Sequence, residues 1–275
     1  MQMHECFCLL HEHFCAINKN MANENKDMFV SERFKMILEY LEAHKRATVE
    51  ELAQKLYVSP ATVRRDFASM QKLGMLQRTH GGAVYLSASE DVSIFVRMEK
   101  ESVSKETVAT VAMNHMPEFT SCFIDNSSTA FALATRMNLA FKTVVTNGLQ
   151  IAAKLSEKKN VEVIFLGGTI RYSNYASTGI YPCKMLDDFH LDVMLSGSAA
   201  VTLEGAYERS LETMEIKQSA FKRCKKRILL VDKSKFAENF IYRTAPLNNY
   251  DLICTDASSE TIAPYVAAGI RVVNR

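Results

Sequence analysis

The feature that most constrains the fold is a regular alternation of short apolar segments and amphipathic segments over residues 105–275. Seven apolar segments predict strands, at 122–124, 143–145, 161–166, 192–195, 227–231, 251–254 and 270–273. The segments between them predict helices, at 128–137, 149–156, 183–189, 210–223 and 259–267, with another beginning near Lys105. This alternation implies crossover connections, and therefore an α/β domain built on a mostly parallel sheet.

Small and polar residues follow five of these predicted strands, in the loops 125–129, 146–148, 167–171, 196–198 and 232–235. Ligands of open α/β sheets bind beyond the carboxyl ends of the strands, so these loops are the first place to look for a site. Hydroxyls and free N–H groups at a helix start can hold a phosphate, and glycine allows the backbone to approach a ligand closely. Each loop alone is more typical of a helix cap or a turn. Five at one edge favour a site for a small polyhydroxylated anion.

A separate helical pattern occupies residues 31–73. Apolar residues at spacings of three and four from Phe34 to Leu41 predict a first helix from Ser31. Thr48 and Glu51 have the spacing of a capping box, which predicts a second helix of about nine residues. Ser59 followed by Pro60 is typical of the start of a third helix.

Gly74 is placed to end the third helix, and two short predicted strands, 75–78 and 83–85, flank the turn His80-Gly81-Gly82. Three helices followed by a hairpin are typical of a winged helix-turn-helix. The net charge of the chain is +2, which by itself favours neither nucleic acid nor membrane. Locally, residues 29–58 carry five basic and five acidic side chains, whereas residues 59–86 carry four basic side chains and one acidic.

The basic and hydroxyl side chains at the start of the third helix are Ser59, Thr62, Arg64 and Arg65. A helix that enters the major groove of DNA needs such groups near its N-terminus. Two adjacent arginines alone are more typical of a solvated helix face. Together with the short turn, the capped helix, the wing and the local charge, they favour DNA binding.

Residues 48–86 resemble the DNA-binding domain of the DeoR family of bacterial transcriptional regulators. The family's VS-x-x-T-[IV]-RRD helix, Gly-x-Leu turn and R-x-HGG wing correspond to residues 58–66, 74–76 and 78–82. The resemblance implies that Ser59, Thr62, Arg64 and Arg65 contact DNA and that Arg78 and His80 support them from the wing.

The resemblance covers about residues 29–257 and includes the family's effector-sensing domain, which is similar to the sugar-phosphate isomerase and coenzyme A transferase fold. The family's D-x-[GS]-[ST]-T, TN, GG-x-x-R and D-x-SKF motifs match residues 125–129, 146–147, 167–171 and 232–236, and Glu212 and Lys217 match less closely. Many relatives read G-[AC]-[DNR]-G after the fourth strand, whereas this chain departs with Gly-Ser-Ala-Ala at 197–200. The effector-binding residues implied by the resemblance are Asp125, Ser127, Ser128, Thr129, Thr146, Asn147, Gly167, Gly168, Arg171, Gly197, Lys217, Asp232 and Lys235.

The resemblance implies a DNA-binding transcriptional regulator, expected to repress genes of carbohydrate metabolism. A phosphorylated sugar or related metabolite would control its affinity for double-stranded operator DNA, and a homo-oligomer would present two recognition helices. The chain is expected not to be an enzyme and to need no cofactor. An alternative hypothesis is a sugar-phosphate isomerase-like enzyme with an appended DNA-binding domain, in which Asp125, Asp232 and Lys235 supply acid and base groups. A pure oligomerisation scaffold would not need five polar loops.

The expected organisation is an extension over 1–28, a winged helix-turn-helix over 29–86, a linker over 87–104 and the α/β domain over 105–275. The extension is rich in His and Cys, but its spacing is not that of a zinc site, and we expect it to be disordered or to precede the true start. No apolar run approaches the roughly 20 residues of a membrane span. The chain shows no secretory signal pattern, so a cytoplasmic location is expected. We expect its seven cysteines to be reduced there.

Overall fold

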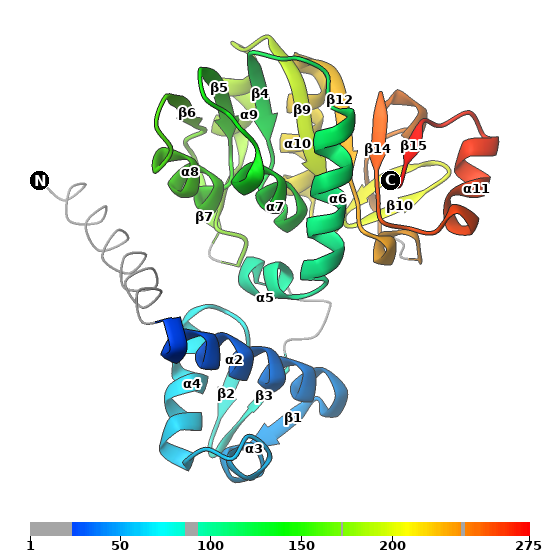
Figure 1. Cartoon of the computed structure of the whole chain (residues 1–275). Helices are drawn as coiled ribbons and strands as arrows, with labels where there is room; N and C mark the ends of the chain where they lie inside the picture. Colours follow the sequence, from blue (N-terminus) through cyan, green and yellow to red (C-terminus); the bar gives the residue numbers. More distant parts are fainter. Residues whose placement is uncertain (1–23, 86–92, 172, 238–239) are drawn as a thin grey trace, which may run out of the picture. The chain divides into compact units, whose positions relative to one another are not determined.

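The computed structural model describes residues 24–85, 93–171, 173–237 and 240–275, in two compact units that divide after Glu90 (Figure 1). The smaller unit holds helices α2 (Glu24–His44), α3 (Val49–Lys55) and α4 (Pro60–Lys72). Strands β1 (Arg46–Thr48), β2 (Gln77–Thr79) and β3 (Gly82–Val84) form an antiparallel sheet in the order β1-β3-β2. The predicted winged helix-turn-helix is present. Helix α2 begins earlier than Ser31, and β1 was not predicted.

Local capping sets the helices of the smaller unit. The Thr48 backbone N–H donates to Glu51 Oε2 at 2.8 Å, and the Glu51 N–H donates back to Thr48 Oγ1 at 3.2 Å, so the predicted capping box forms. Ser59 Oγ accepts from the Thr62 N–H at 3.1 Å and starts α4. The apolar faces of the three helices meet in a small core of Ile37, Leu41, Leu52, Val63, Phe67 and Met70.

The larger unit is built on a seven-stranded sheet in the order β15-β14-β12-β9-β4-β5-β6, in which every pair is parallel. The strands are β4 (Ser121–Ile124), β5 (Lys142–Thr146), β6 (Val161–Phe165), β9 (Leu191–Gly197), β12 (Cys224–Leu230), β14 (Leu252–Cys254) and β15 (Val272–Val273). The helices between or before them are α6 (Ser102–His115), α7 (Ser128–Arg136), α8 (Leu149–Ser156), α9 (Ile180–Leu186), α10 (Leu211–Arg223) and α11 (Ser259–Ala267). The predicted α/β fold class is confirmed.

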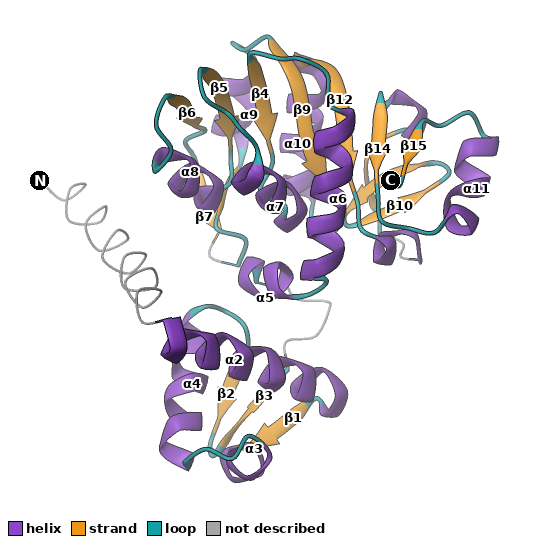
Figure 2. Cartoon of the chain, in the orientation of Figure 1, coloured by secondary structure: helices purple, strands orange, loops and turns teal. Residues whose placement is uncertain are grey.

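Helices cover both faces of this sheet (Figure 2). Helices α6, α7 and α8 lie on one face, over a core that includes Val108, Leu133 and Leu195. Helices α9 and α10 lie on the other, over a core that includes Phe123 and Ile216. The chain order runs outward in opposite directions from the neighbouring strands β4 and β9, so the sheet has its topological switch point between them.

Several short elements of the larger unit escaped prediction. Strands β7 (Thr169–Arg171) and β8 (Ala176–Thr178) form a hairpin, and β10 (Ala200–Thr202), β11 (Gly205–Glu208) and β13 (Tyr242–Ala245) form a small antiparallel sheet. Short 3-10 helices occupy Lys233–Ala237 and Leu247–Asn249. These segments are too short to show a period in the sequence.

The part of the chain expected to be a linker, 87–104, is folded from Ser93 onward. Helix α5 (Ile94–Glu99) starts at a Ser93 cap, and α6 begins at Ser102. The linker expectation is therefore wrong for this part, because Ile94 and Val96 are buried and a six-residue helix gives no sequence period.

The expected extension lies outside the described residues up to residue 23, together with its His and Cys cluster, and residues 24–28 belong to α2. The four cysteines within the described ranges are free. No helix in those ranges has the length and apolar character to cross a membrane.

Candidate functional site

The start of helix α4 presents hydroxyl and basic groups at the surface of the smaller unit. The Ser59 and Thr62 hydroxyls lie 2.9 Å apart and share a hydrogen bond. Arg64 reaches Glu50 at 3.3 Å, but both side chains are more than half exposed, so this ion pair is weak. Arg65 is exposed and has no ion-pair partner among the described residues. These side chains are accessible for contact with a polyanion.

Asp66, the acidic residue that follows the two arginines, has an internal role. Its carboxylate is buried and accepts hydrogen bonds from Arg33 Nε at 2.8 Å and Arg33 Nη2 at 2.9 Å. This two-point contact joins α4 to α2 and fixes the rotation of α4 about its axis. The arginines before it are consequently turned outward.

The wing residues Arg78 and His80 are exposed, as a DNA-facing role requires. The Arg78 backbone N–H donates to Gln71 Oε1 at 3.2 Å, which links the wing to α4. Gly82 packs against β1 so closely that a Cβ there would lie 2.3 Å from the Ala47 carbonyl oxygen. The wing is therefore held to the body of the unit at its base.

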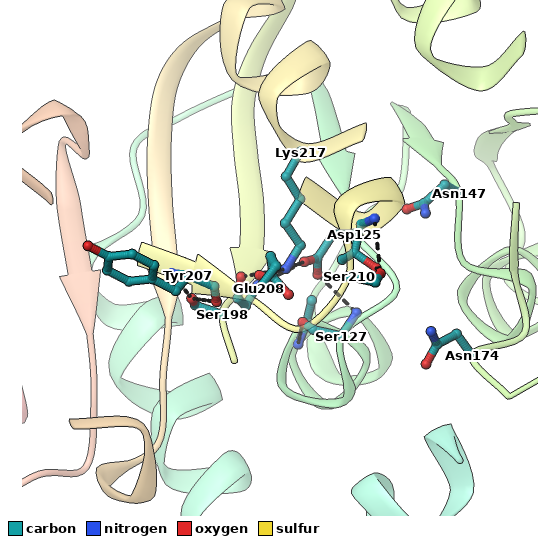
Figure 3. A network of polar contacts seen from close by, with 12 residues as sticks. Asp125, Ser127, Asn147, Asn174, Ser198, Tyr207, Glu208, Ser210 and Lys217 are labelled. Atoms are coloured by element: carbon teal, nitrogen blue, oxygen red, sulfur yellow. Dashed lines mark hydrogen bonds and ion pairs between the residues drawn. The ribbon is translucent and has the colours of Figure 1, made fainter. Parts of the chain in front are cut away.

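At the carboxyl edge of the large sheet, Lys217 reaches from α10 into a buried cluster at the switch point (Figure 3). Lys217 Nζ lies 2.8 Å from Asp125 Oδ2 and 2.5 Å from Glu208 Oε1, and it donates to the Gly197 carbonyl oxygen at 2.8 Å. Asp125 also accepts from the Ser127 N–H at 3.0 Å and from the Gly197 N–H at 3.1 Å. All three protons of the Lys217 ammonium are used within the protein.

Burial and pairing compete in this cluster. Burial lowers the pKa of Lys217, but the carboxylates of Asp125 and Glu208 outweigh it and leave that pKa raised. Burial raises the pKa of Glu208, and the Lys217 ammonium only partly opposes it. Lys217 is therefore charged, and its charge stabilises two buried carboxylates.

The loops after β4, β5 and β9 touch one another. A Cβ on Gly197 would lie 2.5 Å from Ser127 Oγ, and a Cβ on Gly148 would lie 3.0 Å from Asn126 Cα. Ser127 caps α7 by accepting from the Ala130 N–H at 3.1 Å. The N–H groups of the buried residues Ser128 and Thr129 have no acceptor among the described residues. This helix start can offer two donors to an anion.

The loop after β5 is joined to the β7–β8 hairpin. Thr146 Oγ1 accepts from the Gly148 N–H at 3.0 Å, and Asn147 Nδ2 donates to the Ser177 carbonyl oxygen at 3.2 Å. Asn147 Oδ1, Gln150 Nε2 and Ser177 Oγ are buried without hydrogen-bond partners. Three unpaired polar atoms in one neighbourhood are unusual in a folded protein.

The loop after β6 packs on the same hairpin. Gly167 is half-buried, and a Cβ on Gly168 would lie 2.7 Å from Ser177 Oγ and from Pro182 Cδ. Arg171 forms an ion pair with Glu212, the first-turn acid of α10. Four of the five predicted loops thus form a continuous series of contacts.

The fifth loop, after β12, faces a different lysine. Asp232 is fully buried, with Oδ1 bonded to the Ser234 N–H at 3.0 Å and Oδ2 without a partner. Burial lowers the pKa of Lys105 to about 8, Asp232 opposes that change, and Lys235 adds to it. Lys105 Nζ donates to the Arg97 carbonyl oxygen at 2.7 Å. Asp232 and Lys235 therefore lie near Lys105, and within the described ranges no hydrogen bond or ion pair joins them to the Lys217 cluster.

Three charged residues of this edge were missed by the sequence reasoning. Glu208 comes from the short strand β11, and Lys105 was used only to mark the start of a helix. Arg97 lies in the segment expected to be a linker. Its Nη2 donates to Asn174 Oδ1 at 2.9 Å, and its charge opposes the rise that burial causes in the pKa of Glu208. No motif signals these residues, because only tertiary packing brings them to the edge.

The segment Gly-Ser-Ala-Ala at 197–200, which departs from the family's motif, has a local structural effect. Ser198 Oγ donates to the Tyr207 carbonyl oxygen at 2.8 Å and accepts from the Tyr207 N–H at 3.1 Å (Figure 3). This contact holds the loop after β9 against β11, next to Glu208. Within the described ranges, no group of three His, Cys, Asp or Glu side chains is arranged to hold a metal ion.

Two family profiles match this chain. The DeoR-like helix-turn-helix domain matches residues 33–89, and the DeoR C terminal sensor domain matches residues 100–257. The chain belongs to the DeoR family. This DeoR-family protein is thus a transcriptional regulator with a DNA-binding domain and a sensor domain, and the resemblance inferred from its motifs is confirmed.

Named relatives agree with this assignment. The HTH-type transcriptional regulator GolR of Listeria innocua is 31% identical over 83% of this chain and 91% of its own length. The HTH-type transcriptional repressor GlcR of Bacillus subtilis is 29% identical over 83% and 89%. The glycerol-3-phosphate regulon repressor of Escherichia coli is 27% identical over 82% and 91%.

Among solved structures, ribose 5-phosphate isomerase A of Methanocaldococcus jannaschii is similar to this DeoR-family chain with a TM-score of 0.36 and 12% identity. The likeness covers 50% of this chain and 56% of that one.

Proposed function

We propose that this DeoR-family regulator is a repressor of carbohydrate-metabolism genes whose affinity for operator DNA is controlled by a phosphorylated sugar or polyol. The observation that carries this proposal is the series of polar loops in contact at the carboxyl edge of the sheet, with free N–H donors at the start of α7. The Escherichia coli relative is named for the glycerol 3-phosphate regulon, and glycerol 3-phosphate is a phosphorylated polyol, which supports this ligand class.

The hydrogen bonds divide the candidate effector residues into two groups. Asp125, Gly197 and Lys217 use their polar groups on one another, so we assign them to building the site. Ligand contact is assigned to the remaining candidate residues, which lie in the polar loops after the strands. These are Ser127, Ser128, Thr129, Thr146, Asn147, Gly167, Gly168, Arg171, Asp232 and Lys235.

The residues of the second group can bind both the phosphate and the hydroxyl groups of such a ligand. The N–H groups of Ser128 and Thr129, at the positive end of the α7 dipole, suit a phosphate. Hydroxyl groups both donate and accept, so a polyol can satisfy a buried acceptor that has no partner, such as Asn147 Oδ1 or Asp232 Oδ2. We assign these residues to ligand binding rather than to turnover. Recovery of the ligand unchanged after incubation with the protein would support this assignment.

The proposed mechanism also requires a homo-oligomer. Repressors of the helix-turn-helix type bind paired half-sites with two recognition helices, and a ligand that favours one arrangement of these helices changes operator affinity. We assign DNA contact to Ser59, Thr62, Arg64 and Arg65 of α4 and to Arg78 and His80 of the wing. Sedimentation of the protein alone and on its operator tests the oligomer.

Band-shift titration at fixed salt, on DNA from upstream of the gene, tests DNA binding. Arg65→Ala should weaken specific binding by about 10-fold to 100-fold, as expected for a lost base contact. Lys72→Ala is the matched control, because Lys72 is a cation in the last turn of the same helix. Equal effects of the two substitutions would contradict a specific role for the start of α4.

The same titration with a panel of sugar and polyol phosphates tests the sensor. Thr129→Val and Lys235→Ala should abolish release of DNA by the active phosphate and leave DNA affinity intact. Lys233→Ala, in the same loop and exposed, should respond as the parent protein does. Specific DNA binding that no phosphate releases would remove the sensor half of the proposal, and conversion of a phosphate would favour the isomerase alternative.

A further inference from the structure

The turn between α3 and α4 contains a tyrosine in an unusual backbone conformation. Tyr57 has φ of 54°, in the left-handed region that a residue with a Cβ rarely adopts. Its N–H donates to the Gln54 carbonyl oxygen at 3.3 Å, and the Val58 N–H donates to the Ala53 carbonyl oxygen at 3.1 Å. These two bonds form a Schellman motif, in which the position of Tyr57 is usually a glycine.

The tyrosine side chain gains nothing from the fold in return for this strain. It is 95% exposed, so its ring buries almost no apolar surface. Its hydroxyl has no hydrogen-bond partner among the described residues. Glycine or asparagine would meet the backbone requirement with less strain. The Tyr57 side chain is therefore suited to a contact with another molecule.

The position of Tyr57 indicates what it meets. It lies two residues before Ser59, the cap of the helix whose first turns carry Thr62 and Arg65. In a helix-turn-helix this helix start enters the major groove, so the turn before it faces the sugar-phosphate backbone at the edge of the groove. Tyrosine hydroxyls are among the groups that bind DNA phosphates, and such contacts fix the register of a protein on the duplex.

We infer that Tyr57 is a DNA-backbone contact of this regulator, with its hydroxyl on a phosphate and its ring against the adjacent deoxyribose. The inference rests on the proposed function, since it requires binding to double-stranded DNA. It adds a contact that is independent of base sequence. The strain at Tyr57 is retained for affinity, so stability and DNA binding should respond to its substitution in opposite directions.

The test is Tyr57→Gly, measured by thermal unfolding of the full chain and by band shift on two duplexes of equal length, one from upstream of the gene and one of scrambled sequence. The melting temperature of the smaller unit should rise, because the left-handed conformation suits glycine. Affinity for both duplexes should fall by the same factor, about fivefold to tenfold for a lost hydrogen bond with its packing. Tyr57→Phe should lose part of this affinity and leave the salt dependence unchanged.

Phe141 supplies a matched control in the larger unit. It has φ of 61° and is 84% exposed, so Phe141→Gly relieves the same kind of strain and removes the same kind of side chain. It should raise stability and leave affinity for both duplexes unchanged. If Tyr57→Gly binds DNA as the parent does, or loses stability together with affinity, the inference is overturned. If the parent protein binds neither duplex, the proposed function fails instead.

Discussion

The two ends of the parallel sheet each use an aspartate to join β4 to β9, but in different surroundings. At the amino end, Asp192 Oδ2 accepts from the backbone N–H groups of Thr120 and Ser121, at 3.0 and 3.1 Å, and Asp192 Oδ1 meets Lys225 at 2.9 Å. At the carboxyl end, Asp125 has no exposed surface and depends on Lys217. A hydrated carboxylate can lose one partner cheaply, whereas a buried one cannot.

The largest expected effect comes from the carboxyl end. Lys217→Met leaves Asp125 and Glu208 buried without their cation and should lower the free energy of unfolding by about 3 to 5 kcal/mol. Urea denaturation measures it. Adding Glu208→Gln removes one of the two stranded charges, so the double variant should recover part of the loss. If the free energy of unfolding of Lys217→Met lies within about 1 kcal/mol of the parent value, the buried aspartate does not depend on its partner more than the hydrated one does.

A second effect at the carboxyl end depends on pH. The pKa of Lys105 is lowered by burial to about 8, so between pH 8 and its ordinary value the unfolded chain binds more protons than the folded one. Stability should therefore rise with pH in that window, by about 2 kcal/mol between pH 8 and 10. Lys105→Met should lack this rise.

Asp232, Lys235, Glu101 and Arg97 are the charged groups that act on Lys105. Comparing the parent with Lys105→Met at each pH cancels the titration of tyrosines and cysteines elsewhere. Parallel stability curves for the two proteins would contradict a buried, partly neutralised Lys105.

The smallest effect is expected at the amino end. The pKa of Asp192 is lowered by Lys225 first and then by hydrogen bonds from Thr120 and Ser121. Its stabilising contribution is present above the ordinary aspartate pKa and is lost as pH falls below it. Because the site is partly hydrated, we expect about 1 kcal/mol. Melting temperatures of Asp192→Asn and the parent should differ at pH 6 and converge toward pH 2, whereas Asp188→Asn, at an exposed position, should match the parent throughout.

Elements with strong local signals were predictable from the sequence. The capping box at Thr48 and the Ser59-Pro60 start need only neighbouring residues, so α3 and α4 were predicted at their observed starts, whereas α2 begins at Glu24, before the predicted Ser31. Strand β1 was missed because three residues carry no period. Helix α5 was missed because its stability comes from burial of Ile94 and Val96 rather than from a repeat.

The location of the candidate effector site could be predicted from the sequence, but not all of the residues that form it could. Parallel strands bring their carboxyl ends to one edge, so the polar loops had to gather there. Glu208 and Arg97 were not found, because they reach the edge from a short antiparallel strand and from α5. Lys217 was predicted to contact the ligand, but the sequence does not show that its three ammonium protons are already bound within the protein.

Helix α5 also has a consequence for building chimaeric regulators. Its backbone and side chains engage the β7–β8 turn through Ile94 N–H on the Ser173 carbonyl oxygen at 3.0 Å, through Arg97 on Asn174, and through the rings of Phe95 and Tyr175. A foreign DNA-binding domain joined at Lys105 would discard this helix and leave the turn without its cover. The transplantable sensor module therefore begins no later than Ser93, and a graft made there retains α5 together with its contacts to the β7–β8 turn.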